Sequence, residues 1–353
     1  MKIKNKICGL IGAMALLTAC TEETPIDDQT NISTESLSIT FSTEAISTTK
    51  SGTESATNNE RKVSSCFIGF FELDGIGTPG KMIFGNNYNV NTVDQEYNYT
   101  VNDIIVPEKE MSKQVRVLVI ANPPKGNLYA TYSAYNDFTG KGNKGIVSCA
   151  SASAFDPLTL IKVGEVNHTF SINSRTAKVD LRQLAAKVSV EFTLEKDETL
   201  GSPLSWNFVD PYITVSGIVL NSPLLYNKSI IIKKNFGEIG RTQVAEANNN
   251  NVLKYSFYTY QYISSSEEVE SNSLLVKITC GLKAGEDKSL ENLTYKAQIY
   301  PNYTSESVQD GILSGYSYKV TGALKVYDIV NGAVLWQVVD IEKINDIDIP
   351  PFN

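Results

Sequence analysis

The sequence predicts a mainly β protein made of two antiparallel β-sandwich domains in tandem. Three observations carry this prediction. Apolar segments of strand length, alternating or continuous, recur along the chain, whereas helical periodicity is scarce. The 353 residues suffice for about two domains. Hydrophobic residues make up 42% and charged residues 20% of the chain, which is the balance of a folded chain rather than a disordered one.

Residues 1–19 have the pattern of a bacterial lipoprotein signal peptide. Three lysines precede the apolar run Ile7–Leu17, and small residues then lead to Cys20. The run is too short to span a bilayer. We therefore expect cleavage before Cys20, attachment of a lipid anchor (diacylglycerol and palmitate) to the chain there, and export. Residues 20–36 are polar and acidic, which predicts a flexible tether.

The N-terminal domain is predicted to span residues 37–196 and to begin with a half-buried strand. Leu37, Ile39 and Phe41 alternate with small hydroxyl residues, which is the period of a strand with one apolar face. Residues 42–62 are rich in Ser, Thr and Asn, and we expect a long exposed loop there. Further strands are expected at 63–73, 115–121, 166–172 and 187–194.

The C-terminal domain is predicted to span residues 205–353, after a polar boundary segment at 195–205 that contains Gly and Pro. Its expected strands lie at 212–220, 229–232, 255–260, 274–280, 293–300, 316–326 and 334–339. Near its end, Val334, Trp336 and Val338 alternate with their neighbours, and Ile347 and Ile349 alternate with two aspartates.

The sequence offers no credible active site, and we expect no enzyme, cofactor or metal site. The chain has one histidine, His168, and neither a Gly-x-Ser-x-Gly motif nor a glycine-rich phosphate loop. We interpret Lys187 as a strand-edge lysine that faces solvent rather than as a catalytic one. The net charge of −8 argues against nucleic acid as a partner.

Three cysteines remain beyond Cys20, namely Cys66, Cys149 and Cys280. Each lies in or beside an apolar run, and their number is odd. Buried free thiols are therefore favoured over a disulfide pair, which stays open as the alternative.

The two ends of the chain suggest an exchange of strands. Exposed polar loops are preferred sites of proteolysis, and Arg61 lies near the end of such a loop. A cut after Arg61 would leave the strand Leu37–Phe41 held only by non-covalent contacts. Its loss would expose an apolar groove whose unpaired backbone recruits another strand. The alternating segments within 334–352 could supply one; alternatively, both ends are ordinary strands of their own domains.

Five segments, in this order along the chain and behind the lipoprotein signal, resemble the fimbrillins, the pilin subunits of type V pili. They are the signal at Cys20, the apolar strand Val117–Asn122 ending in Ala-Asn, the segment Leu181–Val188, the aromatic strand Phe257–Tyr260 and the segment Tyr316–Val320. Leu181–Val188 is similar to an Arg-x-x-Ala-Lys-Val motif with one extra residue. Ser314 and Gly315 stand where the family has Arg-Asn.

The resemblance implies two transthyretin-like sandwich domains and assembly into a cell-surface fimbrium that supports adhesion. It implies an outer-membrane lipoprotein precursor that a surface Arg-specific protease processes at Arg61. The strand with Leu37, Ile39 and Phe41 would be removed. Other pilin subunits would be the partners, through a donor strand with Val334, Trp336, Val338, Ile347 and Ile349 as groove-filling candidates.

Two other functions remain open at this point. A surface glycan-binding lipoprotein would need exposed aromatic platforms, and Trp336 could stack on a sugar, although a core or interface role suits it better. A surface hydrolase would need carboxylates clustered in a cleft. The role within a pilus, as shaft, anchor or tip, is also open.

Overall fold

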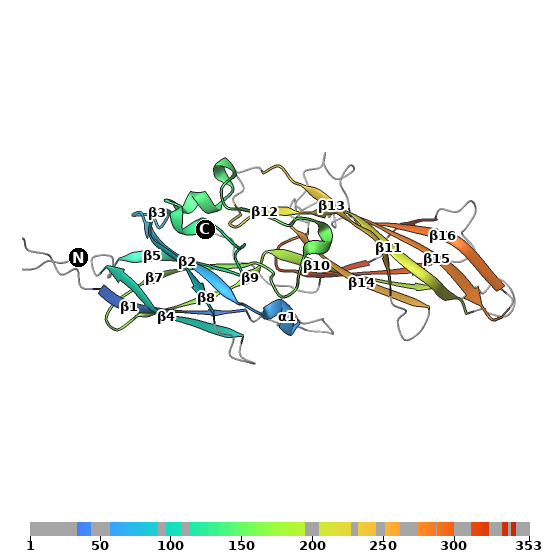
Figure 1. Cartoon of the computed structure of the whole chain (residues 1–353), viewed down its shortest axis with the longest axis horizontal. Coiled ribbons are helices and arrows are strands. Elements are labelled where there is room, and N and C mark those ends of the chain that lie inside the picture. Colours follow the sequence, from blue (N-terminus) through green and yellow to red (C-terminus); the bar gives the residue numbers. More distant parts are fainter. Residues whose placement is uncertain are drawn as a thin grey trace, which may run out of the picture. The chain divides into compact units, whose positions relative to one another are not determined.

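The computed structural model shows a mainly β chain in several sheets (Figure 1). The residues it describes are 34–43, 57–90, 97–107, 113–194, 205–226, 232–244, 251–261, 274–286, 288–299, 312–324, 334–337 and 340–343. Among them, no helix is long and apolar enough to cross a membrane. The predicted signal peptide with Cys20 and almost all of the tether lie outside the described residues, as do 44–56 of the predicted loop.

The first sandwich packs a three-stranded sheet on a five-stranded one. The three-stranded sheet has the order β4-β1-β8, and the five-stranded sheet has the order β3-β2-β5-β7-β9. Their bounds are β1 Thr34–Ser42, β2 Ser65–Leu73, β3 Pro79–Asn89, β4 Asn98–Pro107, β5 Gln114–Ala121, β7 Lys162–Thr169, β8 Thr176–Asp180 and β9 Arg182–Gln183. Apolar side chains from both sheets form one buried cluster between them.

The central strands β2 and β5 of the five-stranded sheet are buried on both faces, which explains why they are continuously apolar rather than alternating. Phe67 and Leu118 point away from the first cluster and pack with Tyr129 and Phe138 of the following segment. That segment consists of short 3₁₀ turns, η2 Tyr129–Thr131, η3 Tyr135–Phe138, η4 Lys141–Asn143 and η5 Ala152–Ala154, and of β6 Ile146–Ser148, which pairs with β12 Asn221–Pro223.

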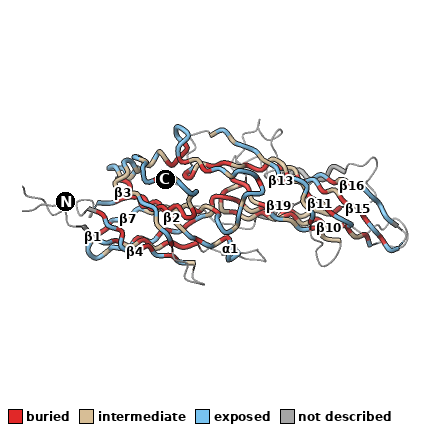
Figure 2. Tube along the Cα trace, in the orientation of Figure 1, coloured by how far each residue is buried: buried red, intermediate tan, exposed pale blue. Residues whose placement is uncertain are grey.

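The second sandwich has sheets of the order β14-β10-β17-β19 and β13-β11-β15-β16-β18. Their bounds are β10 Ala185–Leu194, β11 Asn207–Val219, β13 Phe236–Gln243, β14 Val252–Tyr260, β15 Leu274–Ala284, β16 Lys288–Ile299, β17 Ser317–Leu324, β18 Val334–Gln337 and β19 Asp340–Lys343. Both sheets contribute to a second buried cluster. Buried residues run along the strands of both sandwiches (Figure 2).

The described sheets confirm a mainly β sandwich fold, with two differences from the sequence-based expectation. First, the pairing is mixed, because β1–β8, β10–β17 and β16–β18 are parallel. Second, β10, which we expected within the N-terminal domain, pairs only with strands of the second sandwich. Strand β10 thus begins before the predicted boundary segment and lies in one sheet with strands from beyond it. Residues Thr34–Asn353 form one compact unit, and its division into two domains stays a prediction.

Three of the segments that carry the fimbrillin resemblance lie side by side in one sheet. Strand β10 contains Ala185–Val188 and pairs with the aromatic strand β14 on one side and with β17 on the other. Gly315, just before β17, has a φ of +78°, and a Cβ there would lie 2.4 Å from Cγ of Arg182. The Ser-Gly departure from the family pattern therefore has a local steric reason.

We predict that the centre of β1 contributes strongly to stability. Ile39 is completely buried, whereas Ile105 on the neighbouring strand β4 is 60% exposed. Ile39→Ala should lower the free energy of unfolding by about 2–5 kcal/mol, because it deletes buried methyl and methylene groups. Ile105→Ala makes the same chemical change at the surface and should cost less than about 1 kcal/mol. Urea unfolding of both variants checks this; equal losses would contradict the buried placement of β1.

Candidate functional site

The first candidate element is β1, which is the central strand of its sheet. It pairs antiparallel with β4 and parallel with β8, so both of its edges are hydrogen-bonded. Leu37, Ile39 and Phe41 are at most 1% exposed and point into the cluster between the two sheets. The ring of Phe41 stacks on Tyr99 of β4 with centroids 5.5 Å apart. Without β1, a groove would open between β4 and β8, and apolar side chains of the cluster would line its bottom.

The sequence did not reveal the strand β4 that holds one edge of β1. Residues 98–107 alternate only weakly, and Asn102 and Asp103 interrupt them. Asp103 has a positive φ of 56°, and the pairing with β1 shifts register between Leu37 and Ile39. A bulge of this kind breaks the period of two that identifies a strand from sequence.

The second candidate element is the peptide bond after Arg61, which lies in a folded turn rather than in an exposed loop. Residues Asn58–Arg61 form the short helix α1, which is closed at its start by a capping box between Thr57 and Glu60. The Arg61 carbonyl accepts hydrogen bonds from the Thr43 hydroxyl at 2.9 Å and from the Tyr99 hydroxyl at 3.3 Å. The expectation of a loop throughout 42–62 is thus wrong for its last residues.

The Arg61 side chain is also held. Its guanidinium carbon lies 4.4 Å from the centroid of the Tyr97 ring, a cation–π contact. Proteases bind extended backbone, so a protease could act on the Arg61–Lys62 bond only after α1 opens. The hydrogen bond from Thr43, the residue after β1, to the Arg61 carbonyl therefore links the end of β1 to the Arg61–Lys62 peptide bond.

Glu60 ties α1 to the second sandwich. Its carboxylate accepts a hydrogen bond from the Tyr258 hydroxyl of β14 at 2.5 Å and lies 3.5 Å from Nζ of Lys187 on β10. Burial alone raises the pKa of Glu60, but the hydrogen bonds from Tyr258 and Thr57 and the Lys187 charge outweigh it, so the net pKa is lowered. Glu60 is thus held as a carboxylate. We call Glu60, Lys187 and Tyr258 the Glu60 clamp.

Lys187 is not the solvent-facing lysine that we expected. Its side chain is 16% exposed and belongs to the clamp. Alternation along β10 correctly gave the face on which Lys187 lies, but Glu60 of α1, a helix that precedes β2, contacts the lysine there. The sequence carries no signal for such a long-range contact.

The residues after Arg61 are anchored independently of α1. The Lys62 carbonyl accepts hydrogen bonds from Nδ2 of Asn122 at 2.9 Å and from Nζ of Lys162 at 3.2 Å. Asn122 also accepts from the backbone N–H of Ser64. This gives a structural role to the Ala-Asn end of the apolar strand, which the sequence showed only as a motif. Lys162 was not singled out at all.

Lys162 is almost completely buried, at 3% exposure. Burial lowers its pKa to about 8, with the Glu60 charge opposing the shift. Its ammonium also donates to the Leu160 carbonyl at 2.9 Å. The site thus contains two lysines, Lys162 and Lys187, and the Glu60 carboxylate interacts with both of them.

The third candidate element, the C-terminal segment, is partly described. Strand β18, with Val334 and Trp336, lies parallel to β16 at the edge of its sheet, and β19 lies at the edge of the other sheet beside β17. Val338, Ile347 and Ile349 lie outside the described residues. The candidate donor residues Val334 and Trp336 therefore both lie in β18, an edge strand of the chain's own second sandwich.

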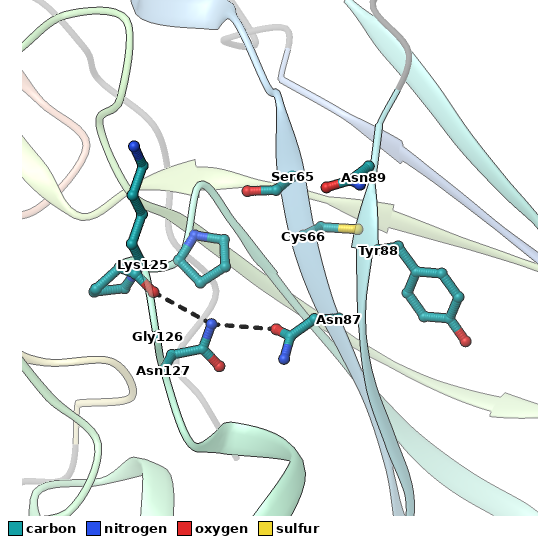
Figure 3. A pocket seen from close by; sticks show the side chains of 10 residues that line it. Ser65, Cys66, Asn87, Tyr88, Asn89, Lys125, Gly126 and Asn127 are labelled. Atoms are coloured by element: carbon teal, nitrogen blue, oxygen red, sulfur yellow. Dashed lines mark hydrogen bonds between the residues drawn. The ribbon is translucent and has the colours of Figure 1, made fainter.

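The remaining features of the described part offer little for binding or catalysis. Cys66, Cys149 and Cys280 are free thiols, and burial raises the pKa of Cys66 and Cys280 to about 12. The residues described contain no cluster of metal ligands. A cavity of about 180 Å³ lies between the start of β2, the end of β3 and residues 123–127, where Asn127 donates to Asn87 (Figure 3). Ligand pockets are usually larger, about 300–1,000 Å³.

The fold is shared with fimbrial and cell-adhesion proteins of known structure. A Parabacteroides distasonis protein assigned to cell adhesion covers 87% of this chain and 95% of its own, at 12% identity and a TM-score of 0.55. A Bacteroides eggerthii protein with the same assignment covers 88% of this chain and 94% of its own, at 16% identity and a TM-score of 0.54. The tip fimbrial protein Mfa3 of Porphyromonas gingivalis, in a C-terminally truncated form, covers 81% of this chain and 94% of its own. Its sequence identity is 11% and its TM-score is 0.52.

No known family model matches the chain, and no curated protein sequence does. At identities this low, the likeness establishes a common fold. The resemblance to fimbrillins expected from the sequence motifs is confirmed at that level.

We predict that the Glu60 clamp limits proteolysis after Arg61. Glu60→Gln removes the charge that pairs with Lys187 and should raise the rate of cleavage by an Arg-specific protease about tenfold or more, because α1 opens more often. Glu165→Gln is the matched control, since it breaks another ion pair, with Arg116 at 2.7 Å, away from α1. Rates that change equally in both variants would contradict the clamp.

We also predict that Lys162 makes stability depend on pH. Its pKa is about 8 in the folded chain against an ordinary 10.5, so between these values the unfolded chain binds a proton that the folded chain does not. The free energy of unfolding should therefore rise with pH across this window, by about 3 kcal/mol relative to Lys162→Met. Urea unfolding at several pH values measures this. The exposed-lysine control Lys178→Met should run parallel to wild type; a parallel Lys162→Met curve would refute the prediction.

Proposed function

We propose that the chain is a pilin subunit of a type V fimbrium that polymerises by strand exchange after proteolysis at Arg61 and supports adhesion. The observation that carries the proposal is the placement of β1, buried between β4 and β8 and followed by the Arg61 turn. A strand in this place can leave only if another takes it. The shared fold with fimbrial and cell-adhesion proteins supports the same function.

The proposed pathway begins with export as a lipoprotein anchored through Cys20 to the outer membrane. A surface Arg-specific protease then cuts the Arg61–Lys62 bond, and the segment up to Arg61 departs with its lipid. The donor strand of another subunit fills the groove, with Val334, Trp336, Val338, Ile347 and Ile349 as the candidate apolar side chains. No catalytic residue, cofactor, metal or nucleic acid enters this account.

Physical estimates are compatible with this exchange. Each of the three inward side chains of β1 contributes roughly 1.5–3 kcal/mol through burial, and each hydrogen bond to β4 or β8 adds about 1 kcal/mol net. An empty groove loses both contributions, so the cleaved subunit has a strong tendency to bind a matching strand. Ordering a free tail opposes this by about 1–2 kcal/mol per residue, which leaves slow strand release as the main source of durability.

The donor must also leave its own sandwich under this proposal. Strands β18 and β19 are four residues each and lie at sheet edges, where each has one hydrogen-bonded neighbour. Such edge strands are the least costly to detach, because only one ladder breaks. The central strand β1 has two ladders, which explains why its release would need a protease while that of β18 would not.

We predict that cleavage after Arg61 is required for polymerisation. A soluble form that lacks Cys20, treated with an Arg-specific protease, should give a ladder of detergent-resistant oligomers by gel and fibres by electron microscopy. Arg61→Lys keeps the positive charge beside Tyr97 but removes the protease site, so it should stay monomeric. Polymerisation of Arg61→Lys, or wild type that is cut after Arg61 and stays monomeric, would contradict the proposal.

A further inference from the structure

The outer face of the five-stranded sheet in the second sandwich carries two lysines directly opposite each other. Strands β11, β15 and β16 lie side by side in this sheet (Figure 1), and Lys277 of β15 pairs with Lys296 of β16. Val276 and Ile278, on either side of Lys277, are buried in the core, so the exposed lysine pair lies on the outer face. Like charges at directly opposed positions destabilise a sheet, so stability does not account for this pair.

Elsewhere the chain neutralises strand lysines with a carboxylate. In the other sheet of the same sandwich, Nζ of Lys254 and Nζ of Lys319 lie 3.2 and 3.3 Å from the Glu191 carboxylate on the strand between them. For Lys277 and Lys296, no carboxylate forms an ion pair within the part of the chain that the structure describes. Their two charges are therefore available to an anion from outside the chain.

A third cation, Arg241 of β13, lies on the same face. Its guanidinium carbon is 3.8 Å from the centroid of the Tyr212 ring. Tyr212 on β11 pairs with Thr279 of β15, which is the next outward residue after Lys277. Stacking on the ring holds the planar guanidinium in place, which suits a bidentate contact with a sulfate or a carboxylate. At the usual strand spacing, the cations on β13, β15 and β16 span about 15 Å.

Hydroxyl groups lie among these cations. Thr214 is opposite Lys277, and Thr279 is opposite Thr294. All three threonines alternate with buried residues and therefore face outward. A hydroxyl can donate to and accept from the neutral oxygens of a ligand, whereas the cations attract its anionic groups. Acidic carbohydrate offers both kinds of group, since sulfates or carboxylates stand among many hydroxyl and ether oxygens.

We propose that this face binds an acidic polysaccharide, with sulfate or carboxylate groups on the cations and sugar oxygens on the threonines. The residues of this cationic face are Arg241, Lys277, Lys296, Thr214, Thr279 and Thr294. The chain as a whole has a net charge of −8, so a polyanion is repelled by most of the molecule and is directed to a local group of cations. The inference goes beyond the proposed function, because it requires neither cleavage after Arg61 nor polymerisation.

The test measures binding of dextran sulfate to the soluble, uncleaved form that lacks Cys20, by titration calorimetry at low salt. Unmodified dextran and poly-glutamate are the comparison ligands, and dextran sulfate should bind at least about tenfold more tightly than either. The double variant Lys277→Gln, Lys296→Gln should weaken binding of dextran sulfate about tenfold or more. Lys254→Gln is the matched control, an exposed lysine on the other sheet, and should bind within about twofold of wild type.

Two further variants separate recognition from misfolding and from charge alone. Because Lys277→Gln removes a like-charge contact, its thermal stability should equal or exceed that of wild type. Thr279→Val removes a hydroxyl but no charge. It should weaken binding of dextran sulfate several-fold, since a sugar oxygen loses its partner, and should leave the weaker binding of poly-glutamate within about twofold of wild type.

Three results would overturn the inference. The cationic face is not the site if dextran sulfate does not bind, or if the double variant binds it as wild type does. The face recognises charge alone, and not a polysaccharide, if poly-glutamate binds as tightly as dextran sulfate and depends equally on the two lysines. Because no cleaved or polymerised chain enters the measurement, each of these failures leaves the proposed function standing.

Discussion

The structure depends most on the burial of β1 between two partner strands. Its three inward side chains complete the cluster between the sheets of the first sandwich, and its backbone completes both β4 and β8. A strand that closes two ladders and a core at once cannot be dispensed with, so its place must be filled by itself or by a substitute. Under the proposed function, loss of β1 would therefore leave a groove that binds a strand from another subunit.

The residues around Arg61 hold the end of β1 in place. Thr43 contacts the Arg61 carbonyl, and Glu60 bonds to residues of the second sandwich. The same few residues thus hold the end of the strand and cover the peptide bond that would free it, and Glu60 interacts with the buried Lys162 and with Lys187. The short helix α1 contains both Glu60 and Arg61, so a change that opens α1 should affect the hold on β1, the access of a protease and the charge near Lys187 together.

The sequence predicted the strands whose apolar period is intact, such as β1, β2, β5 and β10, because inward and outward residues differ clearly there. It missed β4, where a bulge interrupts the period, and it did not indicate that β10 pairs with β14 and β17, because periodicity does not specify a partner strand. Of the candidate site, the sequence predicted the buried face of β1 and the position of Arg61 near the end of the segment that follows this strand. It could not give the Glu60 clamp or Lys162, since their contacts join residues up to 198 positions apart, and a charged residue carries no mark of burial in the sequence.

The central claim is that β1 leaves and a strand from another subunit replaces it. The most direct measurement is the intact mass of every chain recovered from purified, dissociated polymer. The account predicts subunits that begin at Lys62, with the fragment ending at Arg61 absent. Recovery of that fragment in equal amount with the subunits would show that β1 never left its groove, and would contradict the account.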